Sequence, residues 1–564
     1  MFDIKKTQFI TKIISDKIDT RLLLAGANNL ENYIIYNDKK KFIIYDRNCD
    51  HAGGKILSYK NIHKCPYHNW VFDPKKGEYL NGTKKKSLNY KIIGNYLLIK
   101  RKIKIPKISK INSNKSVIIK YINHAFLIVE NSLFKFATDP WAIGPAFGTG
   151  WWLSKESNQN WLKDLNNCKF IYISHNHPDH LHPFTLSHVR KDMLFLIPKF
   201  ASNSVLKCLQ KLNFKNILSA NFLTEYNLKN TDLNFMLLKS GDFRDDSGIL
   251  FSAGRTSFLI SVDSNTLNSH NLPKVDVYGS SFAAGASGFP LVFENYNEIQ
   301  KKKILIQNKV TLKSVRLKEI QKTEAKYFLP YAGSFDEKLL RDNYIKKNNI
   351  KNTLADYGVI ENNNVKLLNI DKYNFFEFYN GILNSERNSK EKNFKDIKPD
   401  VYLKEYKNKF LKINKNYIRK YFIKSNFYER LSLYISLTND NFKNSYLNFC
   451  VNFSNKKIKF NLIKKKINKK NLEKEHNKSK NNILFIKARA DSFMDLILNE
   501  NPWEDLSIGF QCRIFRIPNE YNARFWYHFS NIYIKAEKVR MPSACNACEI
   551  LNQKLQKELA TLQA

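Results

Sequence analysis

The sequence predicts a multidomain α+β protein, because the pattern of residue types changes twice along the chain. Short β-branched and aromatic runs, such as residues 33–36 and 96–103, dominate the first part. Between about residues 116 and 288, strand-like runs alternate with stretches long enough for helices. The remainder is rich in charged, helix-forming stretches. A length of 564 residues leaves room for about three domains.

The composition excludes several classes of protein. Hydrophobic residues make up 43% and aromatic residues 13%, which favours folded domains over a disordered basic chain. The net charge of +42 would suit nucleic acid, but Lys, Asn, Ile and Tyr are all in excess, as an AT-rich coding sequence produces, so nucleic acid is not an expected partner. Eight Cys do not form a disulfide framework, and no leader or membrane-spanning run is visible. We therefore expect a cytoplasmic protein without a membrane span.

The pattern of residue types predicts four regions along the chain: residues 1–108, 114–345, 346–540 and 541–564. The third part contains a Lys/Asn-rich tract at 456–482, which has little apolar periodicity and is expected to be a solvated loop. The fourth part has apolar residues at helical spacing and predicts an amphipathic tail helix. Cys545 and Cys548 precede that helix, but no second Cys pair lies nearby, so a structural zinc site is not expected.

Two loops in the first part each offer one Cys and one His, namely Cys49 with His51 and Cys65 with His68. Two Cys and two His can hold either zinc or an iron–sulfur centre. A zinc finger pairs Cys with Cys and His with His around a helix, whereas each loop here carries one of each in a strand-rich segment. This arrangement favours the iron–sulfur centre.

The Cys-Pro-Tyr-His-Asn-Trp run at 65–70 resembles the second loop of the Rieske family. The resemblance implies an all-β domain over residues 1–108 and a [2Fe-2S] cluster with Cys49, His51, Cys65 and His68 as its ligands. His63 lies between the two loops and is expected to be a surface residue.

A second group of metal-binding side chains follows the strand-like run at 170–174. His175, His177, Asp179 and His180 lie within six residues, so they could bind one or two metal ions at the end of a strand. Asp263 follows another strand-like run, at 258–262.

The His-x-His-x-Asp-His pattern is similar to that of the metallo-β-lactamase fold, which implies a central αββα domain over residues 114–345 with Asp263 as a bridging carboxylate. Hydrolases of this fold usually have further His residues, which segments 193–200 and 279–288 lack. His175, His177 and Asp263 could instead form a two-His, one-carboxylate site for Fe(II), with one or two metal ions. The candidates for a second metal or for support are Asp179, His180, His124 and Asp242; a satisfied core histidine is an equal alternative for His124.

A cluster that relays electrons beside a metal site with open positions indicates an oxygenase that uses O2. The combination resembles the CMP-N-acetylneuraminate monooxygenase family, as do the segments 139–147, 150–152 and 281–290. The resemblance implies hydroxylation of the N-acetyl group of a CMP-linked sialic acid. It also implies electrons from NADH, through a reductase and a b-type cytochrome or ferredoxin.

Other interpretations remain open at this stage. An oxygenase of this architecture could act on another substrate, for example by N-oxygenating an amine, since a fold does not fix a substrate. A metal hydrolase and a nucleic-acid-binding protein are further alternatives. Trp141, Trp151 and Trp152 could line a substrate pocket or pack in a core. The sequence does not predict an oligomeric state.

Overall fold

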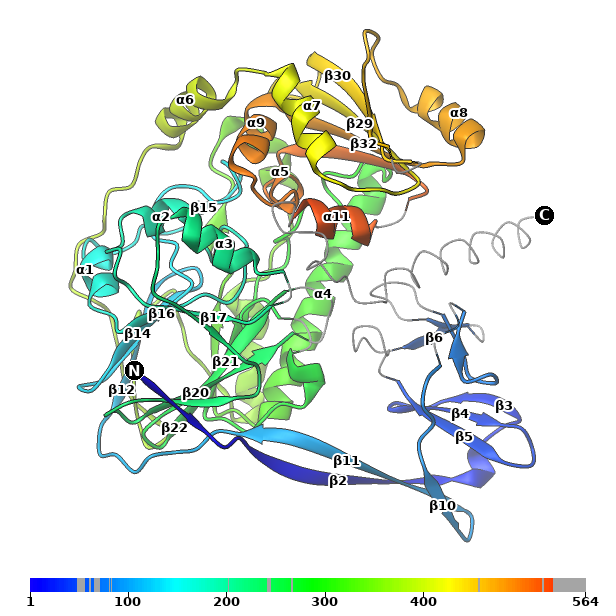
Figure 1. The fold of residues 1–564 in the computed structure, drawn as a ribbon. Coiled ribbons are helices and arrows are strands. Elements are labelled where there is room, and N and C mark those ends of the chain that lie inside the picture. Colours follow the sequence, from blue (N-terminus) through cyan, green and yellow to red (C-terminus); the bar gives the residue numbers. More distant parts are fainter. Residues whose placement is uncertain are drawn as a thin grey trace.

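The computed structural model describes residues 1–47, 56–59, 62–64, 71–80, 82, 84–200, 202–240, 245–264, 267–454, 457–519 and 522–530 (Figure 1). The four predicted cluster ligands, Asp242, and the predicted tail helix with Cys545 and Cys548 lie outside these residues. No helix among the described residues has both the length and the apolar character needed to cross a membrane.

Two eight-stranded sheets form the centre of the molecule. The first sheet has the order β1 (Phe2–Lys5), β19 (Glu225–Leu228), β20 (Leu233–Lys239), β21 (Ser247–Ala253), β22 (Thr256–Ile260), β23 (Val277–Ser281), β24 (Tyr327–Tyr331) and β26 (Lys366–Leu367). The second has the order β18 (Ile217–Ala220), β17 (Phe195–Pro198), β16 (Phe170–Tyr172), β14 (Lys135–Thr138), β13 (Phe126–Glu130), β12 (Val117–Asn123), β27 (Phe375–Tyr379) and β28 (Ile382–Arg387).

The two sheets pack face to face through a single apolar core. Phe136 of the second sheet stacks on Phe170, with ring centroids 4.9 Å apart, and meets Phe251 of the first sheet edge-on at 5.4 Å. The outer face of the second sheet is covered by α1 (Trp161–Asn166), α2 (Pro183–Ser187) and α3 (Ser204–Lys211). The long helix α4 (Glu298–Thr323) contacts β23 of the first sheet (Figure 1). This is the αββα architecture that the sequence predicts.

The central sheets also include strands from outside residues 114–345. Strand β1, at the start of the chain, pairs with β19 of the first sheet, and β27 pairs with β12 of the second sheet. These pairings bury apolar side chains such as Phe376 and Phe378, which the sandwich would otherwise expose at its edge. The sheets are thus continuous across two of the predicted domain boundaries, and the division itself stays a prediction.

The N-terminal unit is joined to the sandwich by a long two-stranded ribbon of β2 (Gln8–Asp19) and β11 (Tyr96–Lys107) (Figure 1). It contains only strands and one 3-10 turn among its described residues. The other strands are β3 (Gly26–Asn29), β4 (Tyr33–Asn37), β5 (Phe42–Asp46), β6 (Leu57–Tyr59), β7 (Ile62–Lys64), β8 (Val71–Asp73), β9 (Glu78–Tyr79) and β10 (Tyr90–Ile93). The surface position expected for His63 is wrong: the residue is 2% exposed, and its Nδ1 lies 2.8 Å from the Ser58 hydroxyl.

The C-terminal unit has its own sheet as well as helices. The sheet has the order β31 (Lys459–Leu462), β30 (Ser445–Asn452), β29 (Leu431–Thr438), β32 (Asn482–Arg489) and β33 (Cys512–Ile517). The helices are α6 (Pro399–Phe410), α7 (Lys415–Lys424), α8 (Lys469–Ser479), α9 (Ala490–Asn499), α10 (Glu504–Ile508) and α11 (Ala523–Phe529). They enclose a second core, which also includes Trp141 and Trp151.

The solvated loop expected at 456–482 is wrong, because the tract contains β31 and α8. Asn468 caps α8 by accepting a hydrogen bond from the Asn471 amide, and Leu472 anchors the helix at 2% exposure. A single apolar anchor gives too weak a periodic pattern for sequence analysis to detect.

The C-terminal unit packs tightly against residues 144–152 of the central domain. A side chain at Gly150 would place its Cβ 2.1 Å from the Gly509 carbonyl oxygen, so the two backbones touch. Buried Arg341, which precedes α5 (Asn343–Asn348), donates hydrogen bonds to Asp491 at 2.6 Å and to Thr149 at 2.5 Å. Nearby, β15 (Trp152–Leu153) pairs with β25 (Phe335–Asp336).

We expect Gly150→Ala to destabilise the protein by about 1–3 kcal/mol, since the added methyl group would force the two backbones apart. The matched control is Gly358→Ala, because a Cβ at Gly358 would meet no atom within 4 Å. Chemical denaturation monitored by tryptophan fluorescence would measure the free energy of unfolding of both variants. Equal stability of the two variants would contradict the close contact at Gly150.

Candidate metal centre

The loop of candidate metal ligands, residues 175–180, follows β16, and the parallel pairing of β16 with β14 places a second loop beside it. Asp139 directly follows β14, and Ser174 and His175 lie just beyond β16. Ends of neighbouring parallel strands meet at the same edge of a sheet, where binding sites of α/β proteins form. On the facing sheet, Asp246 precedes β21 and Asp263 lies beyond the end of β22.

The structure brings five candidate metal ligands together in two overlapping groups. His124, Asp179 and His180 form one group, and His175, His180 and Asp263 form the other. Within each group the ligand atoms lie within 4.8 Å of one another. His180 belongs to both groups, so the two groups meet at its Nε2 atom.

The distances within the groups suit metal binding. His124 Nε2 lies 3.0 Å from Asp179 Oδ2, and His180 Nε2 lies 3.3 Å from the same oxygen and 3.6 Å from Asp263 Oδ2. Ligand atoms that share a metal ion at about 2 Å lie about 3–4 Å apart. Buried His180 Nε2 and Asp179 Oδ1 have no hydrogen-bond partner of good geometry among the described residues. Polar atoms buried in this way need a partner, and a cation would supply it.

Asp139 supports this group from behind. Its Oδ2 lies 3.1 Å from His180 Nδ1 and accepts a hydrogen bond from the Ser174 hydroxyl at 2.8 Å, while its Oδ1 accepts from the Ser174 amide at 2.7 Å. The carboxylate thereby fixes the ring of His180 and leaves Nε2 facing Asp179 and Asp263. Carboxylates in this position orient metal-binding histidines and raise their basicity.

His175 and His177 lie beside each other on the same loop. His175 Nε2 is 3.0 Å from His177 Nδ1, and the other ring nitrogen of His175 is 2.9 Å from the Ser174 hydroxyl and 3.7 Å from Asp246. His177 Nε2 lies 3.5 Å from Glu504 Oε2, at the start of α10 in the C-terminal unit. The C-terminal unit therefore reaches the candidate centre.

The electrostatics of the group follow from burial and close charges. Burial opposes a charge on His180, but Asp179 and Asp263 outweigh it and raise the pKa of His180 well above its usual value. Burial also opposes ionisation of Asp179, yet His180 and His124 keep the pKa of Asp179 well below its usual range. For His175, burial together with the two neighbouring histidines lowers the pKa strongly. A metal ion would displace the proton from His180 and find the carboxylates already ionised.

Aromatic side chains close the site on the side of His124. The ring of His124 lies 5.1 Å from Trp141 and 6.4 Å from Phe335, and Phe335 stacks on Trp151 at 3.6 Å. Trp141, Trp151 and Trp152 are at most 2% exposed, so they pack in the core and do not line an open pocket. Trp141, Trp151 and Phe335 form the buried wall beside His124.

The observed grouping differs in part from the sequence prediction. His175 and Asp263 lie together as expected, but His180 completes their group, while His177 lies beside His175. Sequence analysis missed Asp139, although an acidic residue at the end of a strand is a detectable signal. It also missed Asp246 and Glu504. Glu504 could not be found, because it comes from a distant part of the chain and carries no motif.

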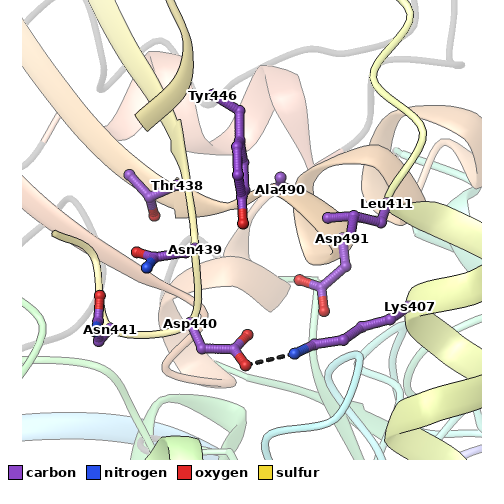
Figure 2. Close-up of a pocket in the computed structure, with 9 residues that line it drawn as sticks. All are labelled: Lys407, Leu411, Thr438, Asn439, Asp440, Asn441, Tyr446, Ala490 and Asp491. Atoms are coloured by element: carbon purple, nitrogen blue, oxygen red, sulfur yellow. Dashed lines mark hydrogen bonds and ion pairs between the residues drawn. The ribbon is translucent and has the colours of Figure 1, made fainter. Parts of the chain in front are cut away.

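A separate pocket of 170 Å³ lies in the C-terminal unit (Figure 2). Figure 2 shows Lys407 extending toward Asp440, with a separation of 2.5 Å between Nζ and Oδ2. The lining residues are Lys407, Leu411, Thr438, Asn439, Asp440, Asn441, Tyr446, Ala490 and Asp491. None of the histidines or carboxylates of the candidate centre lines this pocket.

Comparison with known families identifies the N-terminal unit. The Rieske [2Fe-2S] domain model matches residues 19–94, the segment that contains both Cys-His loops. A chimpanzee (Pan troglodytes) protein named cytidine monophosphate-N-acetylneuraminic acid hydroxylase is 26% identical, covering 94% of this chain and 95% of the relative. The hydroxylase of Cricetulus griseus is 27% identical, covering 91% of this chain and 96% of the relative. This chain is a Rieske-type monooxygenase. It is thus an iron–sulfur oxidoreductase that resembles these hydroxylases over nearly its whole length.

Solved structures also resemble parts of the monooxygenase. The diiron β-hydroxylase CmlA of Streptomyces venezuelae is 15% identical with a TM-score of 0.30, covering 49% of this chain and 55% of that chain. An isothiocyanate hydrolase from Delia radicum gut bacteria is 14% identical with a TM-score of 0.29, covering 44% of this chain and 95% of that chain. The order of the strands in the two central sheets establishes the αββα architecture of the central domain.

We expect His175→Ala to lose metal from the histidine centre while the Rieske cluster remains, because the two sites lie in different parts of the chain. Metal analysis and the electron paramagnetic resonance signal of the reduced cluster would measure the two sites separately. His188→Ala is the matched control, since His188 is an exposed histidine beyond the same loop. Retention of all second-site metal in His175→Ala would contradict the assignment of His175 as a ligand.

Proposed function

We propose that this monooxygenase hydroxylates the N-acetyl group of CMP-N-acetylneuraminate to give CMP-N-glycolylneuraminate. One observation carries the proposal: a Rieske domain and a buried histidine–carboxylate group occur in one chain, which resembles named CMP-N-acetylneuraminic acid hydroxylases almost from end to end. A hydrolase would have no need of a cluster that transfers electrons.

The residues have separate roles in this proposal. Cys49, His51, Cys65 and His68 would hold the [2Fe-2S] cluster. The residues that would hold one or two iron ions are His124, His175, His177, Asp179, His180 and Asp263. When bound, the cluster supplies electrons one at a time and iron supplies the activation of O2.

The reaction balances with an external donor of two electrons. The substrate methyl group loses one C–H bond and gains one C–O bond. One oxygen atom of O2 enters the product, and the other leaves as water with two electrons and two protons. NADH would supply the electrons through a reductase and a small electron-transfer protein, a b-type cytochrome or a ferredoxin.

Side chains around the candidate centre would exclude water, orient a metal ligand and attract the substrate. Buried aromatic rings around His124 exclude water from one side of the site, and Asp139 keeps His180 in one orientation. The charge excess of +42 would attract a substrate that carries phosphate and carboxylate groups.

The direct test is product analysis of iron-loaded protein with CMP-N-acetylneuraminate, a chemical reductant and ¹⁸O₂. We expect a product that gains one oxygen atom, about sixteen mass units with ordinary O2, and that carries the isotope label. No product from protein with a reducible Rieske signal would reject this substrate and direct the search to other acylated sugars and to amines. Turnover without O2 or reductant would indicate a hydrolase instead.

We expect His68→Ala to abolish product formation while the histidine centre keeps its metal, because electron delivery fails before oxygen activation. His175→Ala is the reciprocal variant, which should keep a normal cluster signal and also lose activity. Mass spectrometry of the product, metal analysis and the spectrum of the reduced cluster would be compared in both. Full activity in His68→Ala would exclude the electron relay.

A further inference from the structure

The two ring nitrogens of His177 face different parts of the molecule. Nδ1 lies 3.0 Å from His175 Nε2 and therefore faces the histidine group. Nε2 lies 3.5 Å from Glu504 Oε2, on the opposite side of the ring. The His177 side chain is 15% exposed and that of Glu504 is 29% exposed, so solvent screens this contact only in part.

This arrangement has a direct consequence for metal binding through Nδ1. A metal ion needs the unprotonated nitrogen of the ring, so the proton must reside on the other nitrogen. A carboxylate beside Nε2 stabilises that proton and thereby selects the tautomer that can bind metal.

The position of Glu504 is set by anchors at both ends of α10. Trp503, just before the helix, is fully buried and donates its indole N–H to the Tyr421 hydroxyl at 2.8 Å. At the other end, the Trp151 indole donates to the Ile508 carbonyl at 3.0 Å. The first anchor lies in the core of the C-terminal unit, and the second comes from the central domain. The helix cannot move away from His177 without breaking one of them.

The central domain holds His177 from its own side. Phe147 lies 6.0 Å from the His177 ring, and its backbone oxygen and Cβ lie against Gly509 beyond the end of α10. The same loop that approaches the histidine is thus packed against the segment that carries Glu504.

We propose that Glu504 is a positioning residue through which the C-terminal unit fixes the tautomer and orientation of His177. The inference rests on the proposed role of His177 as a metal ligand. It assigns the C-terminal unit a part in metal affinity, in addition to its contribution to the fold.

The test is a Co(II) titration of the full-length protein that retains its cluster and whose histidine centre has been emptied with a mild chelator. We expect Glu504→Ala to bind Co(II) about 10–100-fold more weakly than the unaltered protein, with the same number of ions bound at saturation. We also expect shifted ligand-field bands, because the imidazole of His177 is no longer held in one orientation by Glu504. Glu504→Gln keeps an oxygen acceptor and should recover part of the affinity.

The matched control is Glu500→Gln. Glu500 also belongs to the C-terminal unit and also reaches the central domain, through a 3.1 Å contact with Lys211, but this ion pair is exposed. The control should keep the affinity and the Co(II) spectrum of the unaltered protein. Its thermal unfolding, compared with that of the Glu504 variants, separates a general loss of stability from a local effect.

Three results would overturn the proposal. The first is unchanged Co(II) affinity and spectrum in Glu504→Ala, and the second is the same loss of affinity in the Glu500→Gln control. The third is that Glu504→Ala binds one Co(II) ion fewer than the unaltered protein even at saturation. The last result would make Glu504 a ligand itself. If all variants behave as expected but the iron-loaded protein forms no hydroxylated product, the positioning role stands and the proposed substrate fails.

Discussion

The hydrogen bonds of Asp139 hold together the part of the structure on which the metal centre depends. One carboxylate fixes both the Ser174 backbone and the ring of His180. Ser174 in turn contacts His175, so the orientation of two candidate ligands depends on this single buried side chain. The parallel pairing of β14 and β16 makes this possible, because it brings the ends of both strands to the same edge.

Backbone strain is concentrated around the same centre. His124, Asp139 and Val262 have positive φ angles of 38°, 39° and 53°. Residues with side chains in this region cost about 1–3 kcal/mol each, and a β-branched residue such as valine adopts it rarely. The close-packed core between the two sheets holds these residues in place, because relaxing their backbone would disturb the packing of the core. The packing of the core therefore offsets the cost of the strained backbone. The turn at Val262 places Asp263 beside His180, where a regular continuation of β22 would carry it away.

The success of sequence analysis depends on how local each signal is. The His-x-His-x-Asp-His run and the end of the strand before it lie within a dozen residues, so spacing alone locates His175 to His180. The alternation of strands and helices in the central domain also follows from local periodicity, whereas the αββα order is implied by the resemblance of the His-x-His-x-Asp-His run. In contrast, β1 and β27 join the central sheets through pairings between distant segments, and Glu504 reaches His177 only after the C-terminal unit has packed on the central domain. Such long-range contacts leave no periodic or compositional trace in a single sequence.

The C-terminal unit changes what the αββα sandwich can do. His177 lies at the edge where the central domain meets the C-terminal unit, 3.5 Å from Glu504. Here α10 and the packed pair Gly150 and Gly509 cover that edge, while stacked Trp151 and Phe335 cover the side of His124. An oxygenase needs such a cover, because water that reaches an activated oxygen species diverts electrons away from the substrate. The C-terminal unit is therefore the part of the chain that closes one edge of the candidate metal centre.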